Sequence, residues 1–501
     1  MHISSTTNNS PATTPTMEGF KPKLPYDTSS LCLKENNLIV IKRSANAAKL
    51  LGCLCLSAFL VGSFTAGTAT AQSLTDLYIQ ALAQDPAVIG AEADIRVAEQ
   101  RRTQARAAFG PSAAIVGSYK DTRYREAPAY ERRDFNEKQL HLQVTQPLLR
   151  SDLFPALDST EAQILQAQAL LDQARTDTAQ RLVEACFEVF KARDALEFAR
   201  AQRISTSEQL TLAQKSFKIG TAPIIDVREA EAQADAVAAQ ISAAEFDLEL
   251  KLQIVAELTG QNAVSLLGRG LDGKQLPPLQ AGEASSWLTA AQDNNAQLRS
   301  ARQAFSSAEA EMRKAWHGHA PTLDLTYTYG RSKDTGTFLT AVSRRGASSA
   351  VGVSLNIPLF ASGATHSRVN EARAMLDKAQ SNVDAALRAV NLGVRQSVSE
   401  TLSAISQAHG LETAVRSQEQ ALRAARRGYE VGMKVNVEVL DSQTRLFEVR
   451  RDLSRARYDA WVSYIRLKAL TGRVDESDIR SLDKLLAPVE QVDLLLSKGT
   501  K

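Results

Sequence analysis

Apolar and polar residues alternate strictly along four short stretches of the chain. In the clearest example, single polar residues separate Leu323, Leu325 and Tyr327. Such alternation gives a β-strand one apolar face and one polar face. The pattern predicts strands at residues 112–119, 140–145, 323–329 and 351–357. These stretches nearly reach the roughly 9–11 residues with which a tilted strand crosses an outer membrane.

The segments that flank these strands indicate where the strands end. Residues 120–137 are polar and rich in arginine, so we predict a loop in water. Pro147 and Pro358 follow two of the strands. Each proline is predicted to end its strand, because proline has no N–H to donate to a sheet. We therefore expect a strand-to-helix transition at each of these prolines.

Helical spacing of apolar residues dominates the rest of the chain. Residues 74–109 predict one helix, which Gly110 and Pro111 would end. Residues 151–219 and 362–431 predict two more helices, each reaching about 100 Å at a rise of roughly 1.5 Å per residue. Helices of this length cannot enclose one globular core, so we expect them to pack laterally as coiled coils.

Two glycines mark the ends of the long helices. Gly220 and Gly432 are predicted to turn the chain back, as glycine does just past a helix C-terminus. Return helices would then run to Gly260 and Gly472. The sequence therefore predicts two helical hairpins, with Gly220 and Gly432 at their tips.

The same succession of predicted elements occurs twice in the chain. Gly220 and Gly432 lie 212 residues apart, and Pro111 and Pro321 lie 210 residues apart. Two further pairs of landmarks keep nearly the same offset: Gln146–Leu149 with Ile357–Phe360, and Leu258–Gly260 with Leu470–Gly472. We infer an internal duplication with a first repeat at 72–260, a linker at 261–283, a second repeat at 284–472 and a tail at 473–501.

The predicted leader covers residues 1–71. Lys42 and Arg43 precede the apolar stretch Leu50–Phe64, and small residues follow at 69–71, which is the order of a secretory signal peptide. The polar residues ahead of this signal suggest a true start codon later than Met1. Cys53 lacks a preceding apolar run, which argues against lipid attachment.

Removal of the leader balances the charge of the chain. Six of the 59 basic and three of the 56 acidic residues lie in the leader, which leaves 53 of each. A balanced chain offers no basic face for nucleic acid. Only Cys186 remains of the four cysteines, so the mature chain cannot form an internal disulfide. After the leader, no apolar run reaches the roughly 20 residues of a transmembrane helix.

No catalytic or cofactor site emerges from the sequence. His317 and His319 have no third ligand at metal spacing, and we interpret them as a polar helix-to-strand junction. A glycine-rich phosphate loop, a nucleophile with its histidine and acid, and paired catalytic carboxylates are all missing from the sequence. We therefore predict that the protein is not an enzyme and uses no metal or cofactor.

Four strands per chain are too few to close a barrel. A small closed barrel needs about eight strands, and lipid tolerates no open sheet edge. Copies of the chain must therefore share strands. Two copies would supply eight strands and three copies twelve, and symmetry alone permits either.

The chain resembles the TolC family of bacterial outer-membrane channel proteins over residues 74 to about 475. The motifs that carry the resemblance are Gln146–Leu148, Ile357–Phe360, Phe217–Gly220, Tyr429–Gly432 and Val439–Gln443. The resemblance implies a mixed, mainly α-helical fold with four transmembrane strands per chain. It also implies a homotrimer with a 12-stranded β-barrel in the outer membrane and an α-helical barrel that extends into the periplasm.

The resemblance also places functional residues at the hairpin tips. Its acidic pore constriction falls on Glu438 and Asp441, and its periplasmic gate on Asp226, Tyr429 and Lys434. This chain departs from the family pattern twice. Glu438 is a longer carboxylate than the family's aspartate, and Lys434 replaces an arginine that could bond bidentately.

The spacing of the two acids is informative without the family. Glu438 and Asp441 are three residues apart and share a helix face, so three copies would direct six carboxylates at one axis. Rings of acidic side chains select cations. The alternative is structural: Asn436 would cap a helix, and acids in its first turn, or Asp226 in another, would stabilise the helix dipole.

Three functions compete. The resemblance favours a passive channel for type I secretion of a protein, with a toxin as one candidate cargo. It would work with an inner-membrane ABC exporter and a periplasmic adaptor. The alternative channel function is multidrug efflux with a drug-proton pump, although such pumps often use lipidated channels. A periplasmic coiled-coil adaptor or scaffold is the candidate from a different class, and it would need no lipid-facing strands.

Overall fold

The computed structural model describes residues 73–125, 132–260, 269–271, 275–280, 282–335, 342–472 and 474–488. All of them belong to the unit that spans Gly67–Lys501. The predicted leader at 1–71 lies outside the described residues. Within the described part of the chain, no helix is both long enough and apolar enough to cross a membrane.

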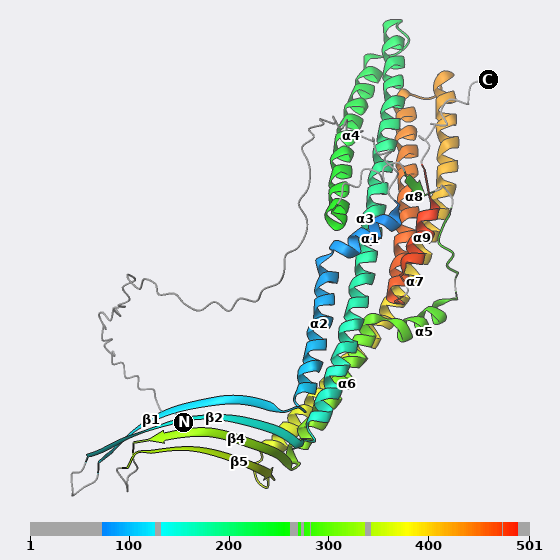
Figure 1. The fold of residues 1–501 in the computed structure, drawn as a ribbon. Coiled ribbons are helices and arrows are strands. Elements are labelled where there is room, and N and C mark those ends of the chain that lie inside the picture. Colours follow the sequence, from blue (N-terminus) through cyan, green and yellow to red (C-terminus); the bar gives the residue numbers. More distant parts are fainter. Residues whose placement is uncertain are drawn as a thin grey trace, which may run out of the picture. The chain divides into compact units, whose positions relative to one another are not determined.

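The described residues are mainly helical, with one four-stranded sheet and one small two-stranded sheet (Figure 1). In chain order the elements are α1 (Leu74–Gln84), α2 (Pro86–Ala107), β1 (Ser112–Arg125), β2 (Arg132–Leu149), α3 (Leu153–Lys218), α4 (Ile224–Thr259), β3 (Arg269–Leu271), α5 (Ala284–Asn294), α6 (Ala296–Trp316), the 3-10 turn η2 (His317–His319), β4 (Thr322–Asp334), β5 (Arg344–Asn356), α7 (Ala364–Glu430), α8 (Asn436–Leu470), α9 (Glu476–Leu485) and β6 (Leu486–Pro488).

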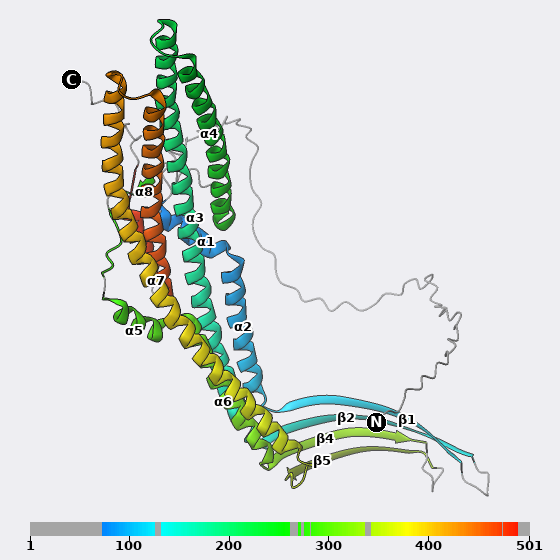
Figure 2. The ribbon, with the colours of Figure 1, turned by 180° about the vertical axis from the view of Figure 1, so that it is seen from behind.

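The long helices begin and end within two residues of their predicted bounds. α3 has 66 residues and α7 has 67. Pro155 lies in the first turn of α3, where a proline removes no hydrogen bond within the helix, and the glycines of α7 are isolated. α3 runs along α2, α4, α6 and α8, while α7 runs along α6 and α8 (Figure 2). The prediction of lateral helix packing is thus confirmed within one chain.

The single helix predicted at 74–109 is wrong. The chain breaks at Asp85, whose backbone is extended, and α2 restarts at Pro86. Proline disfavours the helical region for the residue before it, but suits the first position of a new helix. The second half breaks in the same way at Asn295, between α5 and α6. Asp85 and Asn295 lie 210 residues apart, like Pro111 and Pro321.

The four long strands form an antiparallel sheet in the order β1-β2-β4-β5. They are longer than predicted, with 14, 18, 13 and 13 residues. The loop predicted at 120–137 is mostly strand, because Lys120 pairs with Glu137 and the pairing continues to Arg125 and Arg132. Residues 126–131 lie outside the described residues. Hydrogen bonding between two hairpin arms requires no apolar side chains, so alternation alone underestimated the strands.

Pro147 does not end β2, contrary to the prediction. The strand continues to Leu149, and its register against β4 shifts between Pro147 and Leu149. A bulge of this kind accommodates a proline because it interrupts the regular ladder. Pro358 lies beyond the last residue of β5, Asn356.

The largest hydrophobic core joins both halves of the chain and the tail. It packs α1, α3 and α8 around the fully buried rings of Phe187 and Phe190. The tail, to which the sequence assigned no role, adds α9 to this core through Ile479 and Leu482. β6 then pairs with β3 from the linker between the repeats. The described part of the tail is therefore an integral part of the helical fold.

Candidate functional site

Both hairpin tips are closed by the same backbone turn. Gly220 and Gly432 have positive φ angles of 78° and 74°, which glycine adopts without a steric penalty. At the second tip the Met433 N–H donates to the Gly428 carbonyl oxygen at 2.8 Å, and the Gly432 N–H donates to that of Tyr429 at 3.0 Å. These bonds form a Schellman motif, which satisfies carbonyls at the end of α7.

Glu438 and Asp441 lie at the start of α8 and are exposed in the single chain. Glu438 is in the first helical turn, where a carboxylate is favoured by the helix dipole. The expected cap at Asn436 is wrong, since the capping residue is Val435 and makes no side-chain bond. Asn436 is instead fully buried, and its side-chain oxygen accepts a hydrogen bond from the Gln209 amide on α3.

Lys434 forms an ion pair with Glu438 across the start of α8. The Lys434 Nζ lies 2.7 Å from the Glu438 Oε2, and both side chains are half-exposed. The hydrogen bond from Lys434 holds the pKa of the Glu438 carboxyl below its usual value. One of the two predicted constriction acids therefore has a cationic partner within its own chain.

Asp226 and Tyr429 do not join this pair in the described structure. Asp226 is half-buried in the first turn of α4, next to Val227, which packs with Leu440 of α8. Tyr429 is half-buried against the apolar cluster between α7 and α8. Among the described residues, no hydrogen bond or ion pair connects Asp226 or Tyr429 to Lys434. A gate made by these three residues remains a prediction.

A seam of buried and half-buried amides joins the two hairpins near their tips. Besides the bond between Gln209 and Asn436, the Gln233 amide donates to the Thr444 hydroxyl at 3.0 Å. The side-chain nitrogens of Asn436 and Gln443 are buried and have no hydrogen-bond partner in the part of the chain that the structure describes. This seam could not be predicted from the sequence, because amides on separate helices pair only after the helices pack.

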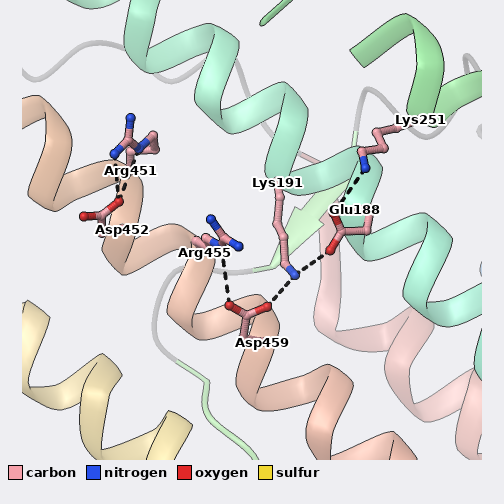
Figure 3. A network of polar contacts seen from close by, with 7 residues as sticks. All are labelled: Glu188, Lys191, Lys251, Arg451, Asp452, Arg455 and Asp459. Atoms are coloured by element: carbon pink, nitrogen blue, oxygen red, sulfur yellow. Dashed lines mark hydrogen bonds and ion pairs between the residues drawn. The ribbon is translucent and has the colours of Figure 1, made fainter. Parts of the chain in front are cut away.

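A charged network connects α3, α4 and α8 farther from the tips (Figure 3). Lys191 on α3 bonds to Glu188 at 2.8 Å and to Asp459 of α8, while Lys251 of α4 lies 3.7 Å from Glu188. Burial alone would raise the pKa of Glu188, but the hydrogen bond from Lys191 and the neighbouring cations lower it. Arg455 completes the network at 3.7 Å from Asp459. The network ties the first hairpin to α8.

One face of the four-stranded sheet is apolar across all four strands. Cross-strand partners share a face, and the row formed by Ala113, Val144, Tyr327 and Val351 is apolar throughout. The next row of cross-strand partners lies on the opposite face and contains Ala114, Gln143, Thr328 and Ala350. The apolar face is open in the single chain, where 72% of the Val351 surface is exposed.

Comparison with known proteins identifies the family. The family model described as outer membrane efflux protein matches residues 77–261 and 287–473. The outer membrane protein TolC of Vibrio cholerae is 30% identical, over 82% of this chain and 93% of that protein. The alkaline protease secretion protein AprF of Pseudomonas aeruginosa is 27% identical, over 82% of this chain and 86% of that protein.

Solved structures give the same fold. The outer membrane protein VceC of Vibrio cholerae superposes with a TM-score of 0.65 at 20% identity, over 80% of this chain and 96% of that chain. The match to the family model covers most of both halves of the chain. This chain belongs to the outer membrane efflux protein family and is a TolC-family channel protein of the bacterial outer membrane.

Proposed function

We propose that three copies of this chain form one channel. Their strands would close a 12-stranded barrel in the outer membrane, and their helices would form an α-helical barrel extending into the periplasm. The observation that carries this proposal is the sheet, which has an exposed apolar face and two open edges. Its strands have at least 13 residues, more than the roughly 9–11 that a tilted transmembrane strand needs.

The open edges favour assembly with other copies. Among the described strands, β1 pairs only with β2, and β5 pairs only with β4. An unpaired edge in lipid leaves backbone N–H and C=O groups without partners, at a cost of several kcal/mol each. Pairing between β5 of one copy and β1 of the next would satisfy both edges. Twelve strands enclose a wider lumen than eight, which suits a duct for large cargo.

The helices offer a surface for the same assembly. Phe246, Leu250 and Ile254 lie four residues apart on α4, so they share one face of the helix. All three are exposed in the single chain, and Phe246 exposes 73% of its surface. A helix of a neighbouring copy packed on this stripe would remove it from water.

Glu438 and Asp441 would then form the constriction of the channel. Both lie on exposed helix surface at the start of α8, close to the second hairpin tip. Contacts of Asp226, Tyr429 and Lys434 with neighbouring copies would hold the tips closed. Asp226 and Tyr429 have no bond to Lys434 within the described part of one chain, which leaves them available for such contacts.

The proposed cargo is a protein exported by type I secretion. An inner-membrane ABC exporter and a periplasmic adaptor would deliver it into the duct. Exposed apolar residues at the tips, among them Ile219, Val431 and Met433, provide a surface for the adaptor. The relative named as an alkaline protease secretion protein supports this cargo. Multidrug efflux is the second candidate, which the description of the family supports.

Planar-bilayer recording tests the channel proposal. Purified mature protein should insert from detergent and give discrete conductance steps. A periplasmic scaffold would leave the bilayer silent. Deletion of the gene in its native host separates the two cargo classes. Loss of one secreted protein, with unchanged drug susceptibility, supports secretion, whereas drug sensitivity with an unchanged secretome supports efflux.

A further inference from the structure

Lys434 is anchored at three points within its own chain. Its backbone N–H donates to the Gly428 carbonyl at 3.1 Å. Its aliphatic stem covers Gly428 so closely that a Cβ at that position would lie 3.0 Å from the Lys434 Cγ and Cδ. Its ammonium bonds to Glu438 at 2.7 Å. The bare backbone of Gly428 thus leaves the lysine room to lie across the turn and reach the acid.

The two departures from the family pattern complement each other in this geometry. Glu438 is one methylene longer than aspartate and reaches back to a residue four positions earlier. Lysine is a compact cation that a single carboxylate can match, whereas arginine presents a wider fork of donors. Lys434 and Glu438 therefore form a matched pair across the tip turn and the first turn of α8.

Asp441 has no such partner. It is exposed on α8, and among the described residues its carboxylate makes no hydrogen bond or ion pair. Arg445, one helical turn farther on, is not within ion-pair distance of it in the described structure. Opposite charges in contact largely cancel beyond their own separation, so the Lys434–Glu438 pair contributes little net charge to the surrounding water.

We propose that Lys434 is a built-in counterion that sets the ion selectivity of the constriction. This inference rests on the proposed position of Glu438 and Asp441 at the channel axis. Lys434 neutralises Glu438, so each copy presents one uncompensated carboxylate, that of Asp441. A trimer then attracts cations with three net negative charges, although its sequence supplies six carboxylates.

Reversal potentials in a salt gradient across a planar bilayer measure this selectivity. Lys434→Met frees the Glu438 charge in each of the three copies. Three added charges about a Debye length from the axis favour cations by about twofold and disfavour anions by about twofold, so the ratio of cation to anion permeability should rise about fivefold. The double variant Lys434→Met with Glu438→Gln removes both charges and should match the wild type. Asp441→Asn should reduce the ratio.

The double variant separates charge from shape. Both variants lose the ion pair, so a loosened tip would change them equally, whereas only the single variant gains net charge. Two results would overturn the counterion role while the constriction stands. One is unchanged selectivity in Lys434→Met. The other is a double variant whose selectivity equals that of Glu438→Gln alone. If Asp441→Asn and Glu438→Gln both leave selectivity unchanged, the constriction lies elsewhere and both proposals fail.

Discussion

An arginine on either face of one strand tests which face of the sheet meets lipid. Val351 and Ala350 are neighbours at the centre of β5, which spans Arg344–Asn356. Val351 lies in the apolar row with Tyr327, and Ala350 lies opposite Thr328 on the other face. Val351→Arg and Ala350→Arg therefore place the same charge at the same depth on opposite faces.

The expected cost follows from the position of Val351. Arginine on the lipid face near the bilayer centre destabilises an outer-membrane barrel by about 2–4 kcal/mol. An assembly of three copies would lose about 6–12 kcal/mol, because each copy contributes one arginine. Ala350→Arg should cost much less, because its side chain would face a water-filled lumen.

Folding into lipid vesicles at increasing urea concentrations measures this difference. Folded barrels are separated from unfolded chains by their mobility in unheated gels. Val351→Arg should need markedly less urea to unfold than the wild type, and Ala350→Arg should remain close to the wild type. Equal loss in both variants, or a larger loss in Ala350→Arg, would refute the assignment of the lipid face.

Three further predictions concern the helical region. Burial alone would raise the pKa of Asp85, but hydrogen bonds from Thr178 and the Ala87 N–H, together with Arg181, bring that pKa below its usual value. Asp85→Asn should therefore lower the melting temperature at neutral pH. The difference in melting temperature from the wild type should shrink as the pH falls below about 3.9, the usual aspartate pKa, and should vanish once the pH is below the lower pKa of Asp85 in the folded protein. Cys186 is fully buried, and burial raises the pKa of its thiol to about 12. Maleimide should therefore label Cys186 only after denaturation. Labelling of the native protein would contradict the packing around this thiol. Ile479→Ala should lower the free energy of unfolding by about 2–5 kcal/mol and lower the melting temperature of the helical circular dichroism signal. Ser481→Ala, at an exposed position of the same helix, should leave this melting temperature unchanged. Equal melting temperatures in the two variants would contradict the packing of the tail in the core.

Long-range regularity made the helices predictable from the sequence. Residues 153–218 and 364–430 present helical spacing over many turns, so local errors hardly move the ends. The break at Asp85 could also have been found. An aspartate before a proline is a typical start of a helix, but the helical composition on both sides concealed the boundary.

The strands and the tail were less accessible to sequence reasoning. Apolar and polar residues alternate along a strand only where one face of the sheet is apolar. β1 and β2 continue beyond that region through pairing with each other. α9 has a short helical pattern whose apolar residues gain meaning only when they meet α1 and α8. The strand extension depends on the opposite arm of the same hairpin, and the burial of α9 depends on partners distant in sequence.

The hairpin tips were predicted in position but not in chemistry. Gly220 and Gly432 occupy the left-handed turns that their positions after long helices indicate. The i to i+4 spacing of Lys434 and Glu438 could have suggested their ion pair. The burial of Asn436 could not be anticipated, because it depends on Gln209 from the other hairpin, 227 residues away.

We infer that several chains pool their strands around one pore. Native mass spectrometry of the purified mature protein, released from detergent micelles, counts the chains directly. Three copies are predicted, from four strands per chain and a barrel of twelve. A monomer that stays folded without detergent, or a stable dimer, would contradict the account.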